Sequence, residues 1–317
     1  MRRVVVTDQA FGQTEAEAAM AADAGADFLA LQLADEAETA SAVAGADVVF
    51  NNFAPMTRPV MAGLAPGAVV IRYGVGVDNV DLNAARDLGV RVCNVPDYGV
   101  EEVADHAAAM ALFLARKVHR FDAAIRAGDW KITKIVDGLR SLSDSTVGMV
   151  GFGRIAQGFA RRMQAFGCRI VAHDPFVETD IAKAADVTLL PLEEVIAAAH
   201  ILSLHAPLTE ATRHMIGAAE LAALPEQAIV VNASRGGLID EDALALALHS
   251  GRIAAAGLDV FEVEPLPKDS PLRDAPNLYL TPHAAFYSDA SVRRLQSLAA
   301  EEAARALRGD PLRCPVV

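Results

Sequence analysis

Cysteine is scarce in this chain, and the few cysteines form no recognisable pattern. The sequence has 317 residues and three cysteines, Cys93, Cys168 and Cys314, with no Cys-x-x-Cys pair. Disulfide-stabilised domains carry denser, even-numbered sets, and structural zinc sites use closely spaced cysteine pairs. The sequence therefore predicts neither a disulfide framework nor a bound metal. Cys93 and Cys168 lie in apolar, strand-like segments and are expected to be buried thiols.

Long apolar runs are lacking too, and so is an excess of positive charge. No segment is long enough to span a bilayer, and the first residues already have the pattern of a strand rather than of a secretory signal peptide. The formal net charge is −13, which would repel nucleic acids and anionic membrane surfaces. We expect a protein of the cytoplasm with no nucleic-acid or membrane partner.

Aromatic residues make up only 5% of the chain, whereas hydrophobic residues in total make up 53%. This surplus of aliphatic residues and alanine is typical of α/β enzymes, and the length allows two domains with separate cores. In the first hundred or so residues, short apolar segments alternate with helical patterns. Strands are expected at 4–7, 28–33, 47–50, 69–72 and 90–93, and helices at 16–24, 37–44 and 81–88. The alternation predicts a small flavodoxin-like domain.

A long helical pattern separates this domain from a second series of strands and helices. It runs from residue 100 to residue 115, and its apolar face repeats at helical spacing, which suits either core packing or a dimer interface. The second series follows, and a last helix at 289–308 is expected to return to the first domain. The predicted domains are residues 1–99 plus 289–317, and residues 100–288.

The most informative motif lies at the start of the second series, where a predicted strand ends in Gly151-Phe152-Gly153. Gly151 allows a tight turn, Gly153 lets a pyrophosphate approach the backbone, and small Ala156 lets the next helix pack closely. The N-terminus of that helix would meet the pyrophosphate charge. About twenty residues later Asp174 ends a second strand, where a carboxylate would bind the ribose hydroxyls. This unit predicts a doubly wound dinucleotide-binding domain.

The same acid bears on the choice of cofactor. A 2′-phosphate beside Asp174 would be repelled, and residues 175–180 contain no Arg or Lys that could bind it. The sequence therefore favours NAD and disfavours NADP.

Three segments in the second half each place a reactive side chain after a predicted strand. Arg235 follows the strand that ends at Asn232, Glu264 lies beyond the strand that ends near Asp259, and His283 follows the last strand. Taken singly, the Arg is more simply a surface ion-pair residue and the His an ordinary loop residue. The carboxyl ends of parallel strands, however, meet at one sheet edge, where open α/β sheets bind ligands.

These three residue types suit the reduction of a 2-oxo acid by hydride transfer. A histidine can donate the proton that a developing alkoxide needs, and a neighbouring carboxylate orients the imidazole and favours its protonated form. An arginine can bind the substrate carboxylate and stabilise charge on the carbonyl oxygen. A nicotinamide cofactor would carry the hydride.

Several motifs together resemble the D-isomer specific 2-hydroxyacid dehydrogenases, in the family's order and over nearly the whole chain. They lie at 151–155, 205–209, 232–237, 257–260, 264–265 and 281–285. Within the family, the segments 72–79, 94–96, 100–105 and 283–288 are most similar to the branch of the C-terminal-binding proteins. The resemblance implies an α/β fold of two Rossmann-like domains around a cleft, namely a flavodoxin-like substrate domain and an NAD-binding domain. It also implies a homodimer formed through the NAD-binding domain.

The resemblance assigns a role to each matching residue. Arg235 would bind and polarise the substrate, His283 would donate or accept the proton, Glu264 would support the histidine, and Asp259 would hold the nicotinamide carboxamide. Cofactor contacts are expected from Gly151, Gly153, Arg154, Ile155, Asp174, His205, Pro207, Thr212, Asn232, Ala233, Ser234, Asp259 and His283. Substrate contacts are expected from Asn52, Arg72, Arg235, His283, Phe286 and the backbone amides of Val75 and Gly76.

Two positions depart from the C-terminal-binding protein pattern. Asn52 stands where that branch has a histidine in the small-domain pocket, and Phe286 stands where it has a tryptophan. The pocket is therefore expected to accept different side chains. The predicted function is NAD-dependent interconversion of a small D-2-hydroxy acid and its 2-oxo acid. The alternative is a dimeric NAD(H)-sensing protein with little turnover, but a sensor would not need Arg235, Glu264 and His283 together.

Overall fold

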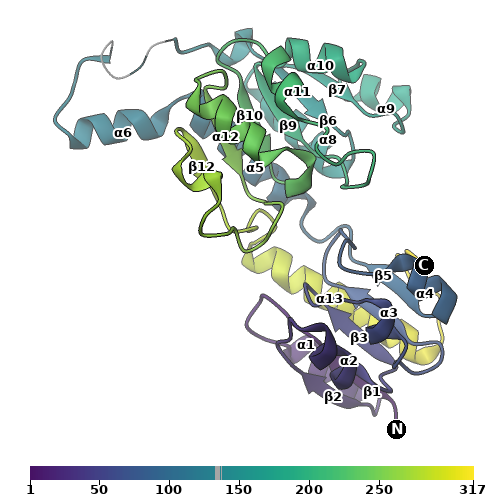
Figure 1. Cartoon of the computed structure of the whole chain (residues 1–317). Helices are drawn as coiled ribbons and strands as arrows, with labels where there is room; N and C mark the ends of the chain where they lie inside the picture. Colours follow the sequence, from purple (N-terminus) through teal and green to yellow (C-terminus); the bar gives the residue numbers. More distant parts are fainter. Residues whose placement is uncertain (133–135, 137) are drawn as a thin grey trace. The chain divides into compact units, whose positions relative to one another are not determined.

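The computed structural model describes residues 1–132, 136 and 138–317, and the chain divides into two compact units. One unit comprises Met1–Gly99 with Tyr287–Val317, and the other comprises Val100–Phe286 (Figure 1). The chain passes to the second unit after Gly99, as expected. It returns to the first unit at Tyr287, two residues before the predicted return at residue 289. The two units are called the small unit and the nucleotide unit below.

The small unit is built on a five-stranded parallel sheet with the order β2-β1-β3-β4-β5. This strand order is that of flavodoxin-like folds, so the predicted domain type is confirmed. Its elements are β1 (Arg3–Val6), α1 (Glu15–Asp23), β2 (Asp27–Ala30), α2 (Glu36–Val43), β3 (Val48–Asn51), α3 (Arg58–Met61), β4 (Val69–Arg72), α4 (Leu82–Leu88), β5 (Arg91–Asn94) and α13 (Asp289–Arg308). The last helix joins this unit, as its position in the sequence suggested.

The strand predicted at 28–33 is shorter than expected. It occupies Asp27–Ala30 at the edge of the sheet, and most of its residues are exposed. The N–H groups of Leu31 and Leu33 still donate to the carbonyls of Val6 and Thr7, both at 2.9 Å. The chain therefore continues beside β1 after the regular ladder ends. As an edge strand, β2 has a neighbouring strand on one side only.

The nucleotide unit has a seven-stranded parallel sheet with the order β12-β11-β10-β9-β6-β7-β8. Its first strand, β6, lies between β7 and β9, so the strand order reverses there, as in doubly wound folds. The strands are β6 (Thr146–Val150), β7 (Arg169–His173), β8 (Thr188–Leu189), β9 (Ile201–Leu204), β10 (Ile229–Asn232), β11 (Ala255–Leu258) and β12 (Leu278–Leu280). The helices are α5 (Val100–Ala115), α6 (Val118–Arg126), α8 (Arg154–Ala165), α9 (Thr179–Ala184), α10 (Leu192–Ala198), α11 (Ala218–Ala223) and α12 (Glu241–His249).

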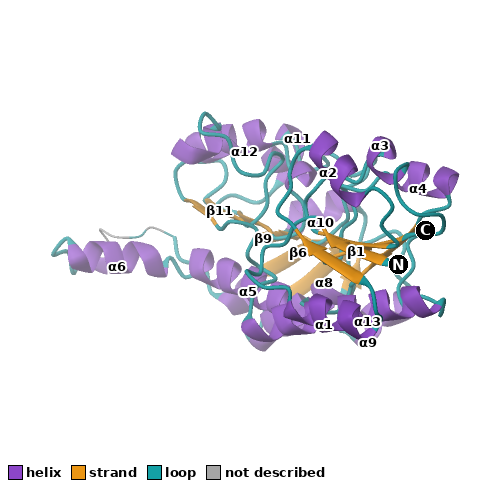
Figure 2. Ribbon diagram, turned by 90° about the horizontal axis from the view of Figure 1, so that it is seen from below, coloured by secondary structure: helices purple, strands orange, loops and turns teal. Residues whose placement is uncertain are grey.

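Successive residues of the central strands face two separate cores. Val147 and Met149 of β6 pack with α5 and α8, whereas Val150 packs with the cluster that includes residues of α10, α11 and α12. Figure 2 shows α5 and α8 on one side of β6 and β9, and α11 and α12 on the other. Because both faces are covered, the strands contain almost only apolar residues, as parallel sheets require.

Helix α5 uses its apolar face inside its own unit. Ala107, Met110 and Leu114 are buried in the core beside β6 and β10. At Gly257 of β11 a Cβ atom would lie 3.2 Å from the Met110 sulfur, so glycine permits this close approach. Core packing therefore accounts for the periodicity of α5, and this face is not available to a partner.

The structure shows the state of the few cysteines and whether any helix could cross a membrane. Cys93 and Cys168 are free and buried, as expected. None of the helices in the described part of the chain has both the length and the apolarity that crossing a bilayer needs.

Candidate active site

Most of the expected site residues lie at one edge of the nucleotide unit. They follow the carboxyl ends of six neighbouring strands, β12, β11, β10, β9, β6 and β7, which all run in the same direction. His283, Asp259, Asn232, His205, Gly151 and Asp174 thus come together from positions up to 132 residues apart (283 minus 151). This edge includes the point where the strand order reverses, which is where doubly wound sheets bind dinucleotides.

The glycine loop between β6 and α8 has the geometry that a pyrophosphate needs. Gly151 has φ +89°, and a Cβ atom there would lie 2.8 Å from the backbone of His205 and Ala206. Gly153 caps α8, and a Cβ atom there would meet nothing within 4 Å. The first N–H groups of a helix lack intrahelical acceptors, so α8 presents them, with the positive end of its dipole, beside open space. Arg154 and Ile155 form its first turn.

Asp174 is tied to the glycine loop. Its Oδ2 accepts the Phe152 N–H at 2.8 Å, and its Oδ1 accepts the N–H groups of Phe176 and Val177 at 2.9 and 3.2 Å. A carboxylate has about four acceptor positions, so one remains for a hydroxyl. The ribose contact of Asp174 stays a prediction, and the acid also holds the loop.

His205, at the end of β9, lines the same edge. Its Nε2 lies 2.9 Å from the Ser203 hydroxyl, and its ring is tilted against Phe159 with a centroid separation of 5.1 Å. Loss of water around the ring lowers the pKa of His205 to about 4, so it is neutral near pH 7. In the following turn the Thr212 hydroxyl donates to the Pro207 carbonyl at 2.7 Å, which fixes that turn.

The loop after β10 is held by its own first residue. Buried Asn232 donates to the Arg235 carbonyl at 2.8 Å and accepts the Ser234 N–H at 3.0 Å. The Ser234 hydroxyl donates to the Ala206 carbonyl, which joins the loops after β9 and β10, and Ala233 packs on the core. At Gly236 a Cβ atom would lie 1.9 Å from the Phe261 backbone, so only glycine fits beside Arg235.

His283 and Glu264 form the pair that the sequence suggested. The His283 Nδ1 lies 2.7 Å from Glu264 Oε2, and the other Glu264 oxygen accepts the Phe261 N–H at 2.9 Å. Burial raises the pKa of the Glu264 carboxyl, but the bond to His283 and its charge, the Phe261 N–H and Arg235 together lower it below its usual value. Glu264 is therefore an ionised acceptor, and the His283 Nδ1 carries the proton between them.

Asp259 follows β11 and bonds to the segment that carries His283, and its contact with a carboxamide stays a prediction. Its side chain is buried, and its oxygens accept the Thr281 hydroxyl at 2.5 Å and the N–H groups of Ala284 and Ala285 at 2.8 Å each. These bonds organise the segment that carries His283. Neither Thr281 nor His106, which contacts it at 3.0 Å, was identified from the sequence. The only available signal was a histidine on an otherwise apolar face of α5.

The substrate contacts expected in the small unit lie at the ends of β3 and β4. Asn52 is buried, and its N–H donates to Asp8 at 3.0 Å. Arg72 donates to the Tyr73 carbonyl and lies 6.0 Å from the Phe53 ring centroid. The N–H groups of Val75 and Gly76 have no acceptor among the described residues, as an anion-binding turn requires. Phe286 is the last residue of the nucleotide unit.

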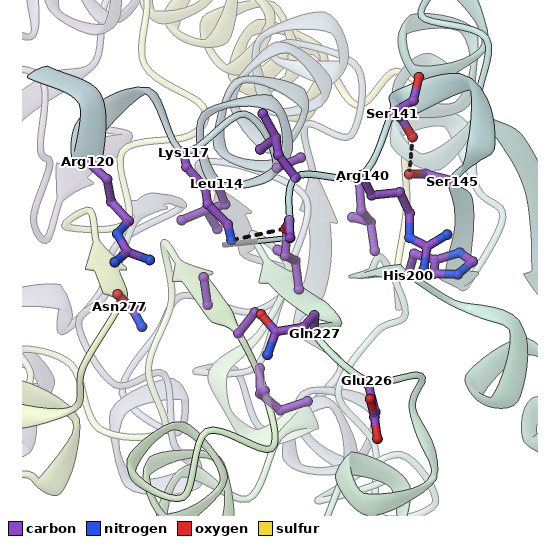
Figure 3. A pocket seen from close by; sticks show the side chains of 18 of the residues that line it. Leu114, Lys117, Arg120, Arg140, Ser141, Ser145, His200, Glu226, Gln227 and Asn277 are labelled. Carbon is purple, nitrogen blue, oxygen red and sulfur yellow. Dashed lines mark hydrogen bonds between the residues drawn. The ribbon is translucent and has the colours of Figure 1, made fainter. Parts of the chain in front are cut away.

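The prominent cavity of the nucleotide unit lies at the opposite edge of its sheet. It has a volume of about 610 Å³ and is lined by His200, Ile229, Ala255 and Asn277, which precede or begin β9, β10, β11 and β12 (Figure 3). Arg120 and Arg140 also line it. This cavity is therefore separate from the site at the carboxyl ends. Across the described part of the chain, no three His, Cys, Asp or Glu side chains lie together as metal ligands.

Comparisons with known proteins agree with this geometry. Residues 108–285 match the model of the NAD-binding domain of D-isomer specific 2-hydroxyacid dehydrogenases. Among curated proteins, the chain is 40% identical over 262 residues to a glyoxylate reductase from Korarchaeum cryptofilum, covering 80% of this chain and 79% of the relative. It is 39% identical over 267 residues to D-3-phosphoglycerate dehydrogenase from Methanocaldococcus jannaschii, covering 84% of this chain but only 50% of the relative.

Solved structures agree over the full length. The TT0316 protein from Thermus thermophilus has a TM-score of 0.88 and 35% identity, with 99% of this chain and 100% of that chain covered. D-lactate dehydrogenase from Aquifex aeolicus, complexed with NAD and lactic acid, has a TM-score of 0.87 and 25% identity, with 97% and 96% covered. An acyclic imino acid reductase complexed with NADPH and D-Arg, with a TM-score of 0.89 and 23% identity, shares the fold over 100% of both chains.

The loss of water around the His205 ring leads to a prediction about stability. Its pKa is lowered from 6.5 to about 4, so the unfolded chain takes up a proton between these values that the folded chain does not. The free energy of unfolding should therefore fall as the pH drops from 6.5 toward 4, and His205→Gln should make that fall shallower. Urea denaturation across this pH range measures both slopes. Exposed His249→Gln is the control, and equal slopes for all three proteins would contradict the assignment.

Proposed function

The chain belongs to the D-isomer specific 2-hydroxyacid dehydrogenase family, and from this we propose that it interconverts a small D-2-hydroxy acid and its 2-oxo acid with NAD. The observation that carries the proposal is the His283–Glu264 pair at 2.7 Å, with Arg235 on the neighbouring strand end. An acid/base histidine, a supporting carboxylate and a substrate-binding arginine are the groups that this reaction needs.

The hydrogen bonds determine which histidine nitrogen exchanges the proton. Because ionised Glu264 can only accept, Nδ1 of His283 keeps its proton, and Nε2 is the atom that donates to or accepts from the substrate oxygen. In the reductive direction a protonated imidazole donates its Nε2 proton to the alkoxide, while its Nδ1–H stays bonded to Glu264. In the oxidative direction, Nε2 removes the hydroxyl proton.

Arg235 is the proposed substrate-binding residue. Its guanidinium matches a carboxylate in shape and charge and would stabilise the developing negative charge on the carbonyl oxygen. The bonds of Asn232 and the absence of a Cβ at Gly236 keep its loop in one conformation. We propose that Asn52, Arg72, Phe286 and the backbone amides of Val75 and Gly76 complete the substrate contacts.

The nucleotide edge fits NAD. The glycine loop, the start of α8 and Asp174 would hold the pyrophosphate and ribose, and the loops after β9 and β10 would hold the rest. When bound, NAD supplies the hydride acceptor or donor. Asp174 retains one acceptor position for a ribose hydroxyl, and a 2′-phosphate would be repelled by it, so we propose that NAD is preferred over NADP.

We also propose a homodimer formed through the nucleotide unit, with helix α6 and the residues that follow it at the interface. Helix α6 has no buried residue, and Figures 1 and 2 show it standing away from the sheet of its unit. Val118, Ile125 and Ile132 are exposed, and Trp130 is 84% exposed. Exposed apolar side chains concentrated in one segment indicate an interaction site, and the start of α6 borders the cavity of Figure 3.

The first test of the function is NADH oxidation with a panel of 2-oxo acids, from glyoxylate and pyruvate to hydroxypyruvate, oxaloacetate and phenylpyruvate. At least one should be reduced, and His283→Ala should lower kcat by roughly 10²–10⁴-fold while NADH binding persists. Exposed His249→Ala should change neither. Near-normal turnover by His283→Ala would overturn the mechanism. If wild type binds NADH but reduces none of the acids, that result would favour an NAD(H)-sensing role instead.

A second prediction concerns the cofactor. Asp174→Ala removes both the ribose acceptor and the charge that repels a 2′-phosphate, so it should weaken NADH binding more than NADPH binding. The ratio of the two dissociation constants, measured by cofactor fluorescence, should move toward NADPH. Asp180→Ala, an exposed acid on α9, is the matched control. If Asp174→Ala leaves the ratio unchanged, Asp174 does not set the preference.

A third prediction concerns the dimer. Ile125→Glu and Trp130→Glu should shift the protein toward monomer in sedimentation experiments, because each would place a charge in an apolar interface. Leu246→Glu, at an exposed leucine of α12, is the matched control. Trp130 is the only tryptophan, so its fluorescence should move to shorter wavelength as protein concentration rises. A wild-type monomer at micromolar concentration would contradict the proposal.

A further inference from the structure

His106 of α5 contacts the segment that carries His283, although it lies far from it in the sequence. Its Nε2 is 3.0 Å from the Thr281 hydroxyl and 3.7 Å from Asp259 Oδ1. The side chain is 26% exposed, so it is neither a surface residue nor part of the apolar core. The other residues on this part of α5 are mostly alanine, and nothing in the helix itself requires a histidine there.

The direction of the hydrogen bonds follows from the chemistry of the three groups. The Thr281 hydroxyl has one proton and lies 2.5 Å from Asp259 Oδ1. An ionised carboxylate can only accept, so the hydroxyl proton is directed at Asp259. The hydroxyl oxygen must then accept from His106, which therefore carries a proton on Nε2. The result is a chain of donors from His106 through Thr281 to Asp259.

Asp259 in turn fixes the backbone on both sides of His283. Its side chain accepts the N–H groups of Ala284 and Ala285, and its carbonyl accepts the His283 N–H at 2.7 Å. His283 itself has φ +52°, a left-handed conformation that non-glycine residues adopt only when their surroundings hold them in it. The network of His106, Thr281 and Asp259 provides those surroundings.

We propose that His106 is a positioning residue for the reaction. By donating to Thr281 it keeps the Thr281 hydroxyl directed at Asp259, and Asp259 then holds the His283 backbone so that the imidazole meets Glu264. The inference rests on the proposed function of His283. His106 exchanges no proton with substrate in this scheme. Its contribution is to confine the His283 ring to one orientation, which reactions of this type depend on.

The test compares two replacements of His106. His106→Leu fills a similar volume without a donor, whereas His106→Gln places an amide N–H near the position of Nε2. His106→Leu should lower kcat about tenfold, less than the roughly 10²-fold that a 1 Å misplacement can cost. The substrate KM, the NADH dissociation constant and the melting temperature should stay close to wild type. His106→Gln should recover most of the loss, and His249→Leu should have no effect.

A double-mutant cycle identifies the route of the effect. Thr281→Val should also lower kcat, and combining it with His106→Leu should add little, because both changes interrupt the same chain. Fully additive losses, or an unchanged kcat in His106→Leu, would overturn the proposal. Parallel losses of NADH binding and melting temperature would show a structural role instead and would also overturn it.

One measurement does not depend on turnover. The ring signals of His283 in proton NMR spectra, assigned by their loss in His283→Gln, should shift in His106→Leu and return in His106→Gln. If wild type reduces none of the acids but these signals respond as expected, the proposed function fails and the positioning role stands. If the enzyme is active but the His283 ring signals do not change in His106→Leu, the positioning role is wrong and the proposed function stands.

Discussion

The site depends on one constraint, the parallel alignment of the strands in the nucleotide unit. Because all seven strands run the same way, their carboxyl ends open at a single edge, and each following loop contributes there. No single loop carries all of the candidate site residues. Gly151, His205, Arg235 and His283 come to one edge only because β6, β9, β10 and β12 share one sheet. The two cores on either face keep these strands in register and so keep the loops in place.

Much of this arrangement could be predicted from the sequence, for reasons that individual residues make clear. The parallel sheets of both units follow from the regular alternation of apolar strands and helices. The glycine loop is recognisable because Gly151 meets a steric demand that no other residue meets, and Gly153 leaves the start of α8 open. The pairing of Glu264 with His283 could be predicted because the two residues follow neighbouring strands. Such features are local patterns or direct consequences of strand direction.

Other features could not be predicted, because they depend on contacts between distant segments. The contact of His106 with Thr281 spans 175 residues and depends on how α5 packs beside β11 and β12. The burial of Asp259 also could not be predicted from the sequence, since an acid after a strand can equally face a ligand or support a loop. The length of β2 depended on its place at the sheet edge, which a strand's own sequence does not reveal. In each case the deciding partner lies outside the segment itself.

Asp174 has two functions in our proposal, discrimination between cofactors and support of the glycine loop. This limits how the proposed cofactor preference could be re-engineered or could evolve. The carboxylate that would discriminate against a 2′-phosphate also accepts the Phe152 N–H inside the glycine loop. Replacing it with a basic residue would therefore remove a repulsive charge and, in the same step, release the turn on which we propose that the pyrophosphate binds. A productive route would first supply the Phe152 N–H with a neutral acceptor, such as an asparagine or serine oxygen, and only then add positive charge among residues 175–180.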